Sequence, residues 1–164
     1  MSTIAYLTIK AQRQGVIKGG VTIKGREGTI AVDAVRSQIE TPIDPRSGAL
    51  TGKRQHHPIA ITMSIDQSSP KLYQALITNE TLTDVTIAFW RPSLDRSGNP
   101  SGPETQYFTI TLTNAYVVGV TLDSQDPTKT AAAPYEEVQL TYQKIAWTWN
   151  DGGISAMDDW TTPA

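Results

Sequence analysis

The feature that most constrains this fold is a two-residue alternation of apolar with small or polar side chains. It is clearest at residues 59–66, which read Ile-Ala-Ile-Thr-Met-Ser-Ile-Asp. Successive side chains of a strand point to opposite faces, so this pattern predicts a strand with one buried face. Related patterns predict further strands at residues 4–9, 21–23, 30–39, 82–91, 105–112, 115–122 and 135–149. Asn114 is expected to mark a bend between two of them.

One segment, about residues 69–78, carries a helix signature. Ser69 is expected to be the N-cap and Pro70 the first helical residue, where the missing N–H of proline costs nothing. Apolar residues then recur at spacings of three and four, and Asn79 is expected to end the helix in a left-handed conformation. A helix this short is marginal alone and must dock on a sheet. The predicted fold is mainly β, a compact antiparallel β-barrel or two-sheet sandwich with one short flanking α-helix.

A long extended loop, about residues 41–58, separates two predicted strands. Prolines and glycines punctuate it, and Lys53 and Arg54 make it basic. The run that begins at Gly48 resembles a phosphate-binding loop, but its spacing is one residue short and a strand follows it. Arg54 also stands where a Ser or Thr would reach magnesium. Loops of this length in a small domain are usually functional, so we interpret it as a contact surface for other proteins.

The composition narrows the possible functions. The 164 residues suffice for one domain with a hydrophobic core, and a formal net charge of −2 provides no basic field to attract nucleic acid. The absence of cysteine excludes disulfides, thiolate zinc sites and thiol catalysis. The histidines, His56 and His57, are adjacent, so on an extended chain they point opposite ways and do not easily chelate one metal. No nucleophile–base motif is present, and we expect no enzyme, no metal and no cofactor.

The two ends of the chain give further expectations. The N-terminus lacks the pattern of a secretory signal, and no apolar run approaches the length of a membrane span. We therefore expect synthesis in the cytoplasm, no membrane insertion, and no use of the general secretory route. Residues 150–164 are expected to form a flexible tail. There, Asp158 and Trp160 belong either to an acidic docking tail or to an end folded back on the barrel.

Two tryptophans suggest an alternative function. Ile145, Trp147 and Trp149 share one face of a predicted strand. The tryptophans fit buried barrel positions, and they also fit a stacking platform for a ligand. A ligand-binding β-barrel, for example a carbohydrate module, is therefore the alternative to an assembly function.

Several motifs, taken together and in order, resemble the Hcp family (hemolysin-coregulated protein), the tube protein of bacterial type VI secretion systems. The motifs lie at residues 42–58, 65–76, 85–91, 107–115, 137–149 and 158–160. The resemblance covers most of the chain from about residue 40 onward, whereas residues 12–28 match less well. It implies a single Hcp-like tube domain over residues 1–164. Phage tail-tube proteins are similar in fold and role.

The resemblance also implies how such a chain works. It implies homohexameric rings with a central lumen that stack into a tube inside a contractile sheath, on a baseplate and capped by a spike protein. Sheath contraction expels the tube, and some members carry effector proteins in the lumen. The chain would then assemble in the cytoplasm and be secreted by the type VI system without a signal peptide.

Candidate contact residues follow from the loop and from the resemblance. We expect the loop to contact the next ring through a basic set, consisting of Arg46, Lys53, Arg54, His56 and His57. In this family the strand at residues 32–39 runs along the inner wall of the ring. The resemblance therefore makes Arg36 and Ser37 candidates for contact with cargo in the lumen.

Overall fold

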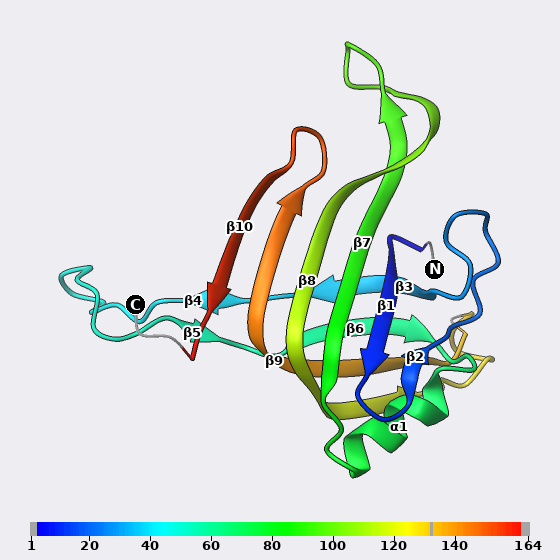
Figure 1. The fold of residues 1–164 in the computed structure, drawn as a ribbon, viewed down its shortest axis with the longest axis horizontal. Coiled ribbons are helices and arrows are strands. Elements are labelled where there is room, and N and C mark those ends of the chain that lie inside the picture. The colour runs from blue at the N-terminus through cyan, green and yellow to red at the C-terminus, as the bar shows by residue number, and fades with distance from the viewer. Residues whose placement is uncertain (1–2, 132, 162–164) are drawn as a thin grey trace.

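The computed structural model describes residues 3–131 and 133–161, and it shows a curled antiparallel sheet with one helix (Figure 1). The elements are β1 (Ala5–Ala11), β2 (Gly15–Ile17), β3 (Ile30–Arg36), β4 (Ile39–Glu40), β5 (Gln55–His56), β6 (Ile59–Ser64), α1 (Ser69–Ile77), β7 (Leu82–Leu94), β8 (Pro100–Asp123), β9 (Tyr135–Trp149) and β10 (Ile154–Asp159). The predicted mainly-β fold with a short helix near residues 69–78 is confirmed.

The strand pairings form a closed circuit. They run from β6 through β3, β1, β7, β8 and β9 and return to β6, and every pair is antiparallel. Strands β2 and β10 are added at the sides, on β1 and β9 respectively. The alternating apolar side chains of these strands point inward and form one buried cluster, which includes Ile59, Ile61 and Met63. Closure removes most of the unpaired edges that an open sheet would expose.

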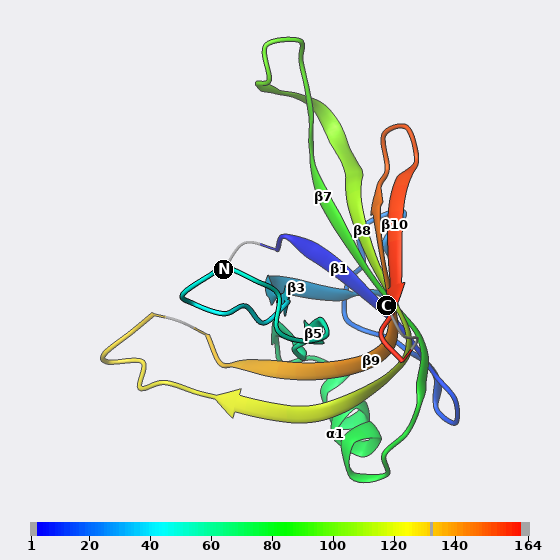
Figure 2. The same cartoon turned by 90° about the vertical axis from the view of Figure 1, so that its left-hand side faces the viewer.

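Strands β8 and β9 bend, so that each belongs to two layers of the sheet (Figure 2). Strand β8 is continuous over the two segments predicted at residues 105–112 and 115–122, and it pairs with β9 along both. The predicted bend at Asn114 is confirmed, because this residue has a φ of 51° within the strand. Asparagine adopts this left-handed conformation more readily than most residues. Its Nδ2 donates a hydrogen bond of 3.0 Å to Oε1 of Gln143 on β9, which holds the bend.

We expect Asn114→Val to lower the free energy of unfolding by about 1–3 kcal/mol, because a β-branched residue is strained at positive φ. Asn114→Gly loses the same side-chain bond without that strain and should cost less. Urea unfolding of the two variants measures the difference. Equal stability of the valine and glycine variants would show that the backbone conformation at this bend carries no constraint.

The start of helix α1 differs from the prediction by one residue. The N-cap is Ser68 rather than Ser69, and its side chain makes no capping bond. The carboxylate of Asp66 instead accepts a hydrogen bond of 2.7 Å from the backbone N–H of Ser68, which shifts the helix start. The predicted stop is confirmed, since Asn79 follows the helix with a φ of 51°. Leu72 is fully buried and, with Ala75, joins the helix to the core.

Two other segments differ from the predicted strands. Residues 21–23 form no strand, because the chain closes a loop there in which the N–H of Gly28 bonds to the carbonyl of Val21 at 2.9 Å. Strand β2 pairs with β1 in its place. Strand β10 was not among the predicted strands, and it places residues 154–159 of the expected tail against β9. Residues 162–164 of that tail lie outside the described part of the chain.

One acidic residue lies inside the barrel. Glu136, on β9, is fully buried, and its Oε1 accepts a hydrogen bond of 2.6 Å from the hydroxyl of Ser69. Its Oε2 is buried and has no hydrogen-bond partner among the described residues. Burial raises the pKa of Glu136, the bond from Ser69 opposes this rise, and the negative charge of Asp66 adds to it. The raised pKa shifts the equilibrium of Glu136 toward the protonated, neutral acid.

Glu136→Gln is expected to stabilise the protein by about 1 kcal/mol at pH 8, because it removes a buried negative charge. A raised folded-state pKa means that the wild type loses stability as pH rises through that pKa. The gain should therefore vanish below the ordinary pKa of 4.5. Thermal unfolding across this pH range checks the sign, with Glu137→Gln on the outer face as the matched control. A wild type that is the more stable form at pH 8 would contradict the expectation.

Candidate functional site

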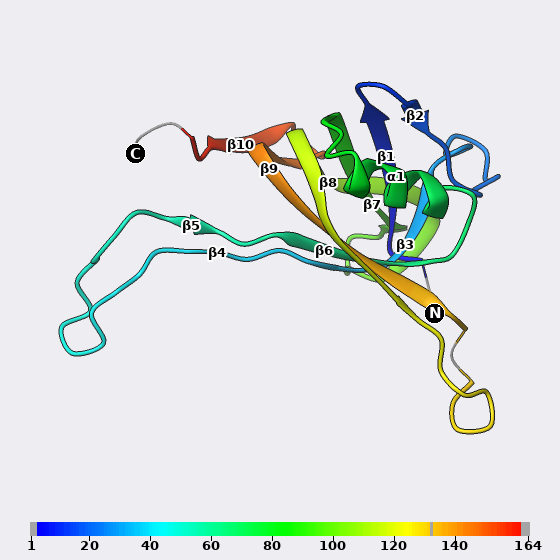
Figure 3. The ribbon, with the colours of Figure 1, turned by 90° about the horizontal axis from the view of Figure 1, so that it is seen from below.

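The predicted loop at residues 41–58 is an extended hairpin that projects away from the barrel (Figures 1 and 3). We call residues 38–57 the arm. Strands β4 and β5 pair at its base, and an isolated bridge joins Ile43 to Leu50 near its tip. Backbone bonds between these points, such as Thr51 N–H to the Pro42 carbonyl at 2.9 Å, keep the two sides together. The arm is therefore a ribbon with defined faces.

The tip and the base of the arm differ in chemistry. Residues paired across an antiparallel ribbon share a face, so Ile43 and Leu50 lie together near the tip, and we call this pair the apolar stripe. Nearer the base, Ile39 pairs with His56. Ile43 is 57% exposed and Leu50 is 74% exposed. The base also carries polar side chains, and there His57 Nε2 bonds to the carboxylate of Glu40 at 2.8 Å. Exposed leucine and isoleucine on a projecting ribbon indicate a surface that contacts another molecule.

Side chains from β5, β9 and the end of β10 meet where the arm leaves the barrel. We call this cluster the arm anchor, and its members are Arg54, His56, Tyr142, Asp158 and Trp160. Arg54 donates to both carboxylate oxygens of Asp158, from Nε at 2.6 Å and from a terminal nitrogen at 2.9 Å. His56 Nε2 bonds to the same carboxylate at 2.7 Å, and its Nδ1 bonds to the Tyr142 hydroxyl at 2.7 Å. One carboxylate on β10 therefore binds two side chains of the arm.

Trp160 closes the outer side of this cluster. Its ring lies 5.5 Å from that of His56, centroid to centroid, and its Nε1 donates to the backbone carbonyl of Tyr142. The side chain of His56 is only 1% exposed as a result. Of the two interpretations of the C-terminal segment, the structure favours the end folded back on the barrel.

The electrostatics of the anchor are consistent with its hydrogen bonds. The bond from the Arg54 guanidinium lowers the pKa of Asp158, and this effect, with that of His56, outweighs partial burial. Burial, with a smaller contribution from Asp158, raises the pKa of Tyr142 to about 12. An ionised carboxylate only accepts, so His56 Nε2 carries the proton that bonds to Asp158. In a neutral ring Nδ1 then accepts from the Tyr142 hydroxyl.

Tyr142→Phe should lower the free energy of unfolding by about 1–2 kcal/mol, because it leaves the buried Nδ1 of His56 without a partner. Tyr116→Phe is the matched control, since it removes an exposed hydroxyl bond of 3.0 Å to Thr81. We expect the control to cost less than about 0.5 kcal/mol. Chemical denaturation of both variants gives the comparison. The expectation fails if the two substitutions cost the same.

The structure separates the predicted contact residues into two groups. Arg54 and His56 belong to the arm anchor, where Asp158 binds both. Arg46 is exposed near the tip of the arm and Lys53 is exposed beside Arg54, while His57 pairs with Glu40 at the base. The sequence showed both the basic loop and the acidic tail. No local signal indicated that these two segments, whose bonded residues are 102–105 positions apart in the chain, are in contact.

The predicted lumen residues lie beside the arm. Arg36 ends β3, and Ser37 follows it. Arg36 lines a shallow groove of about 430 Å³ on the outer face of the sheet, together with small and polar residues of β3, β6 and β9. Glu137 is the acidic residue of this groove.

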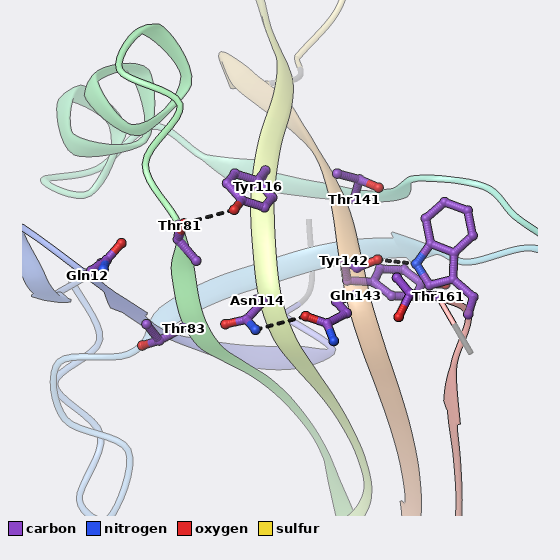
Figure 4. A pocket seen from close by; sticks show the side chains of 10 residues that line it. Gln12, Thr81, Thr83, Asn114, Tyr116, Thr141, Tyr142, Gln143 and Thr161 are labelled. Carbon is purple, nitrogen blue, oxygen red and sulfur yellow. Dashed lines mark hydrogen bonds between the residues drawn. The ribbon is translucent and has the colours of Figure 1, made fainter.

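A second groove, of about 520 Å³, lies where β8 and β9 bend (Figure 4). Its lining is uncharged and consists of Gln12, Thr81, Thr83, Asn114, Tyr116, Thr141, Tyr142, Gln143, Trp160 and Thr161. Several of these groups bond to one another, including Thr81 to Tyr116 and Asn114 to Gln143. The groove contains no acid–base pair with which to perform chemistry.

The two tryptophans predicted on one face lie in different surroundings. Trp147 packs against the core, as expected of a barrel residue. Trp149 is more exposed, and its ring lies 6.2 Å from that of Tyr107, with the guanidinium of Arg91 over both rings. Within residues 3–131 and 133–161, no group of three His, Asp or Glu residues is placed to hold a metal ion. In the same part of the chain, no helix has the length and hydrophobicity needed to cross a membrane.

Comparison with known proteins identifies the family to which this chain belongs. A family model described as "Type VI secretion system effector, Hcp" matches residues 6–149. The "Major exported protein" of Pseudomonas aeruginosa is 34% identical over 175 residues, which is 99% of this chain and 98% of the relative. The chain belongs to the Hcp family.

Solved Hcp structures agree with this assignment. A mutant of the Hcp1 protein from E. coli EAEC 042 has 36% identity and a TM-score of 0.84, over 97% of this chain and 99% of that chain. The secreted protein Hcp3 from Pseudomonas aeruginosa has 29% identity and a TM-score of 0.76, over 98% and 100% of the two chains.

Membership of this family confirms the resemblance inferred from the sequence motifs. Hcp proteins are structural tube components of type VI secretion systems rather than a known family of enzymes. The family implies self-assembly and partners within the secretion system, and it makes this chain a secreted protein.

Proposed function

We propose that this Hcp chain forms homohexameric rings that stack into the inner tube of a type VI secretion system. The spike, the baseplate and the contractile sheath are its partners in that system, and contraction of the sheath expels the tube. The observation that supports an assembly role is the arm, a projecting ribbon whose apolar stripe is exposed among the described residues. A ring forms when the same two different surfaces meet repeatedly and the rotation closes.

The arm provides the contact between one ring and the next. Burial of Leu50 and Ile43 against a neighbouring copy would contribute about 1.5–3 kcal/mol for each side chain, before the cost of association. Arg46 lies near the tip of the arm and Lys53 lies next to Arg54, and both are exposed. Charges at the rim of a contact contribute more to orientation and association rate than to affinity. Among the predicted set, these two residues are therefore the ones placed to meet acids of a neighbouring ring.

The face that carries Arg36 and Ser37 lines the lumen in this proposal. Its groove is shallow and its residues are mostly small or uncharged, including Ala34, Ala60 and Gln139. A surface of this composition binds other proteins weakly. Arg36 provides a positive charge that an effector inside the ring could contact.

Shortening the arm tests this proposal. Replacement of residues 43–50 by Asn-Gly joins Pro42 to Thr51 through a two-residue turn and leaves the arm anchor in place. We expect hexameric rings to persist, whereas stacked tubes and secretion are lost. Negative-stain microscopy and secretion assays measure these outcomes.

A charge variant serves as the matched control. Arg46→Gln with Lys53→Gln keeps the apolar stripe and should slow tube formation, with the larger effect at low salt. A shortened arm that still gives tubes and normal secretion would exclude the arm as the ring-to-ring contact. A monodisperse monomer in the wild type would exclude the ring itself.

A further inference from the structure

The arm has little structure of its own to hold it in place. A two-stranded ribbon is at best marginally stable in water, and the stripe residues Ile43 and Leu50 are exposed rather than packed on the barrel. Strands β4 and β5 pair over only two residues each. The direction in which the arm projects must therefore be set by contacts at its base.

Among the described residues, most side-chain bonds from the arm to the barrel converge on the C-terminal segment, the exception being His56 Nδ1 with the Tyr142 hydroxyl on β9. Arg54 binds the Asp158 carboxylate through two nitrogens and also donates to the Asp159 carbonyl at 3.2 Å. His56 binds the same carboxylate, and its partner on the other side of the arm is Ile39. Fixing Arg54 and His56, at the start of β5 and within it, therefore restrains both strands of the ribbon.

The arm anchor is partly shielded from solvent, which strengthens its ion pair. The side chains of Arg54 and Asp158 are 22% and 26% exposed, and Trp160 covers His56. A bidentate guanidinium–carboxylate pair has a fixed planar geometry, so it restrains direction as well as distance. An exposed single-bond pair such as His57 with Glu40 restrains the arm far less.

We infer that Asp158 is a positioning residue for the arm: the end of strand β10 aims the arm and thereby controls ring stacking. This inference rests on the proposed function, because it takes the arm to be the stacking contact. Asp158 lies outside the buried core cluster. Its loss should release the arm without opening the barrel.

The test compares Asp158→Asn with Asp159→Asn. The control acid lies next in the chain, but its carboxylate bonds to Thr161 and Gln143 rather than to the arm. In Asp158→Asn we expect amide hydrogen exchange in the arm, at Asp44, Thr51 and His57, to accelerate about tenfold or more. Exchange in β1 and β7 should stay within about twofold of wild type, because the barrel remains closed. The control should match wild type in both regions.

Assembly is measured on the same variants. Asp158→Asn should form rings and lose most tube formation, whereas Asp158→Glu, which keeps a carboxylate at this point, should recover most of it. Arg54→Gln removes the pair from the arm side, outside the barrel, and should reproduce the effect even if the β10 variant folds poorly.

The outcomes distinguish the anchoring of the arm by Asp158 from the control of ring stacking. Unchanged exchange in the arm of both Asp158→Asn and Arg54→Gln would overturn the positioning role. Faster exchange in the arm with normal tubes would support the anchoring of the arm by Asp158, and it would overturn both its control of stacking and the arm as the stacking contact. Loss of tubes in Asp159→Asn as well would overturn the specific role of Asp158.

Discussion

The pairing of β8 with β9 is the interaction on which the rest of this structure depends. The two strands pair on both sides of their bends, so one ribbon supplies strands to two layers of the sheet. A flat ribbon of this length would leave half of its apolar face in water. The left-handed residue Asn114 and its bond to Gln143 allow the ribbon to bend at one point instead. The remaining strands then complete the circuit and enclose a single core.

The same construction decides where polar groups enter the core. Strand β9 carries Glu136 into the barrel beneath the start of helix α1, where Ser69 satisfies only one of its two oxygens. Ser69 also accepts a hydrogen bond from the backbone N–H of Asp66, so the helix start, the acid and the strand form one connected network. A partly satisfied network of this kind is costly, and burial of this carboxylate raises the pKa of Glu136.

The arm lies outside this core and differs from it in chemistry. The barrel buries its apolar residues, whereas the arm displays Ile43 and Leu50 to solvent. Hcp proteins work as assemblies, so an apolar stripe on the isolated chain is consistent with burial by a neighbouring copy. The basic residues of the arm divide accordingly. Arg54 and His56 bind Asp158, whereas Arg46 near the tip and Lys53 beside Arg54 are exposed.

The sequence by itself determined the class of fold, most strand positions, the helix and the family. These follow from local signals: two-residue alternation, a proline near the helix start, asparagines that tolerate positive φ, and motifs in a fixed order. Strand β10, the continuity of β8 and the arm anchor emerged only in the tertiary structure. Each depends on a partner far away in the chain, as Asp158 depends on Arg54 and His56. An ion pair across such a distance leaves no periodic pattern in the sequence, so only the folded chain shows that a tail carboxylate and a loop guanidinium form one site.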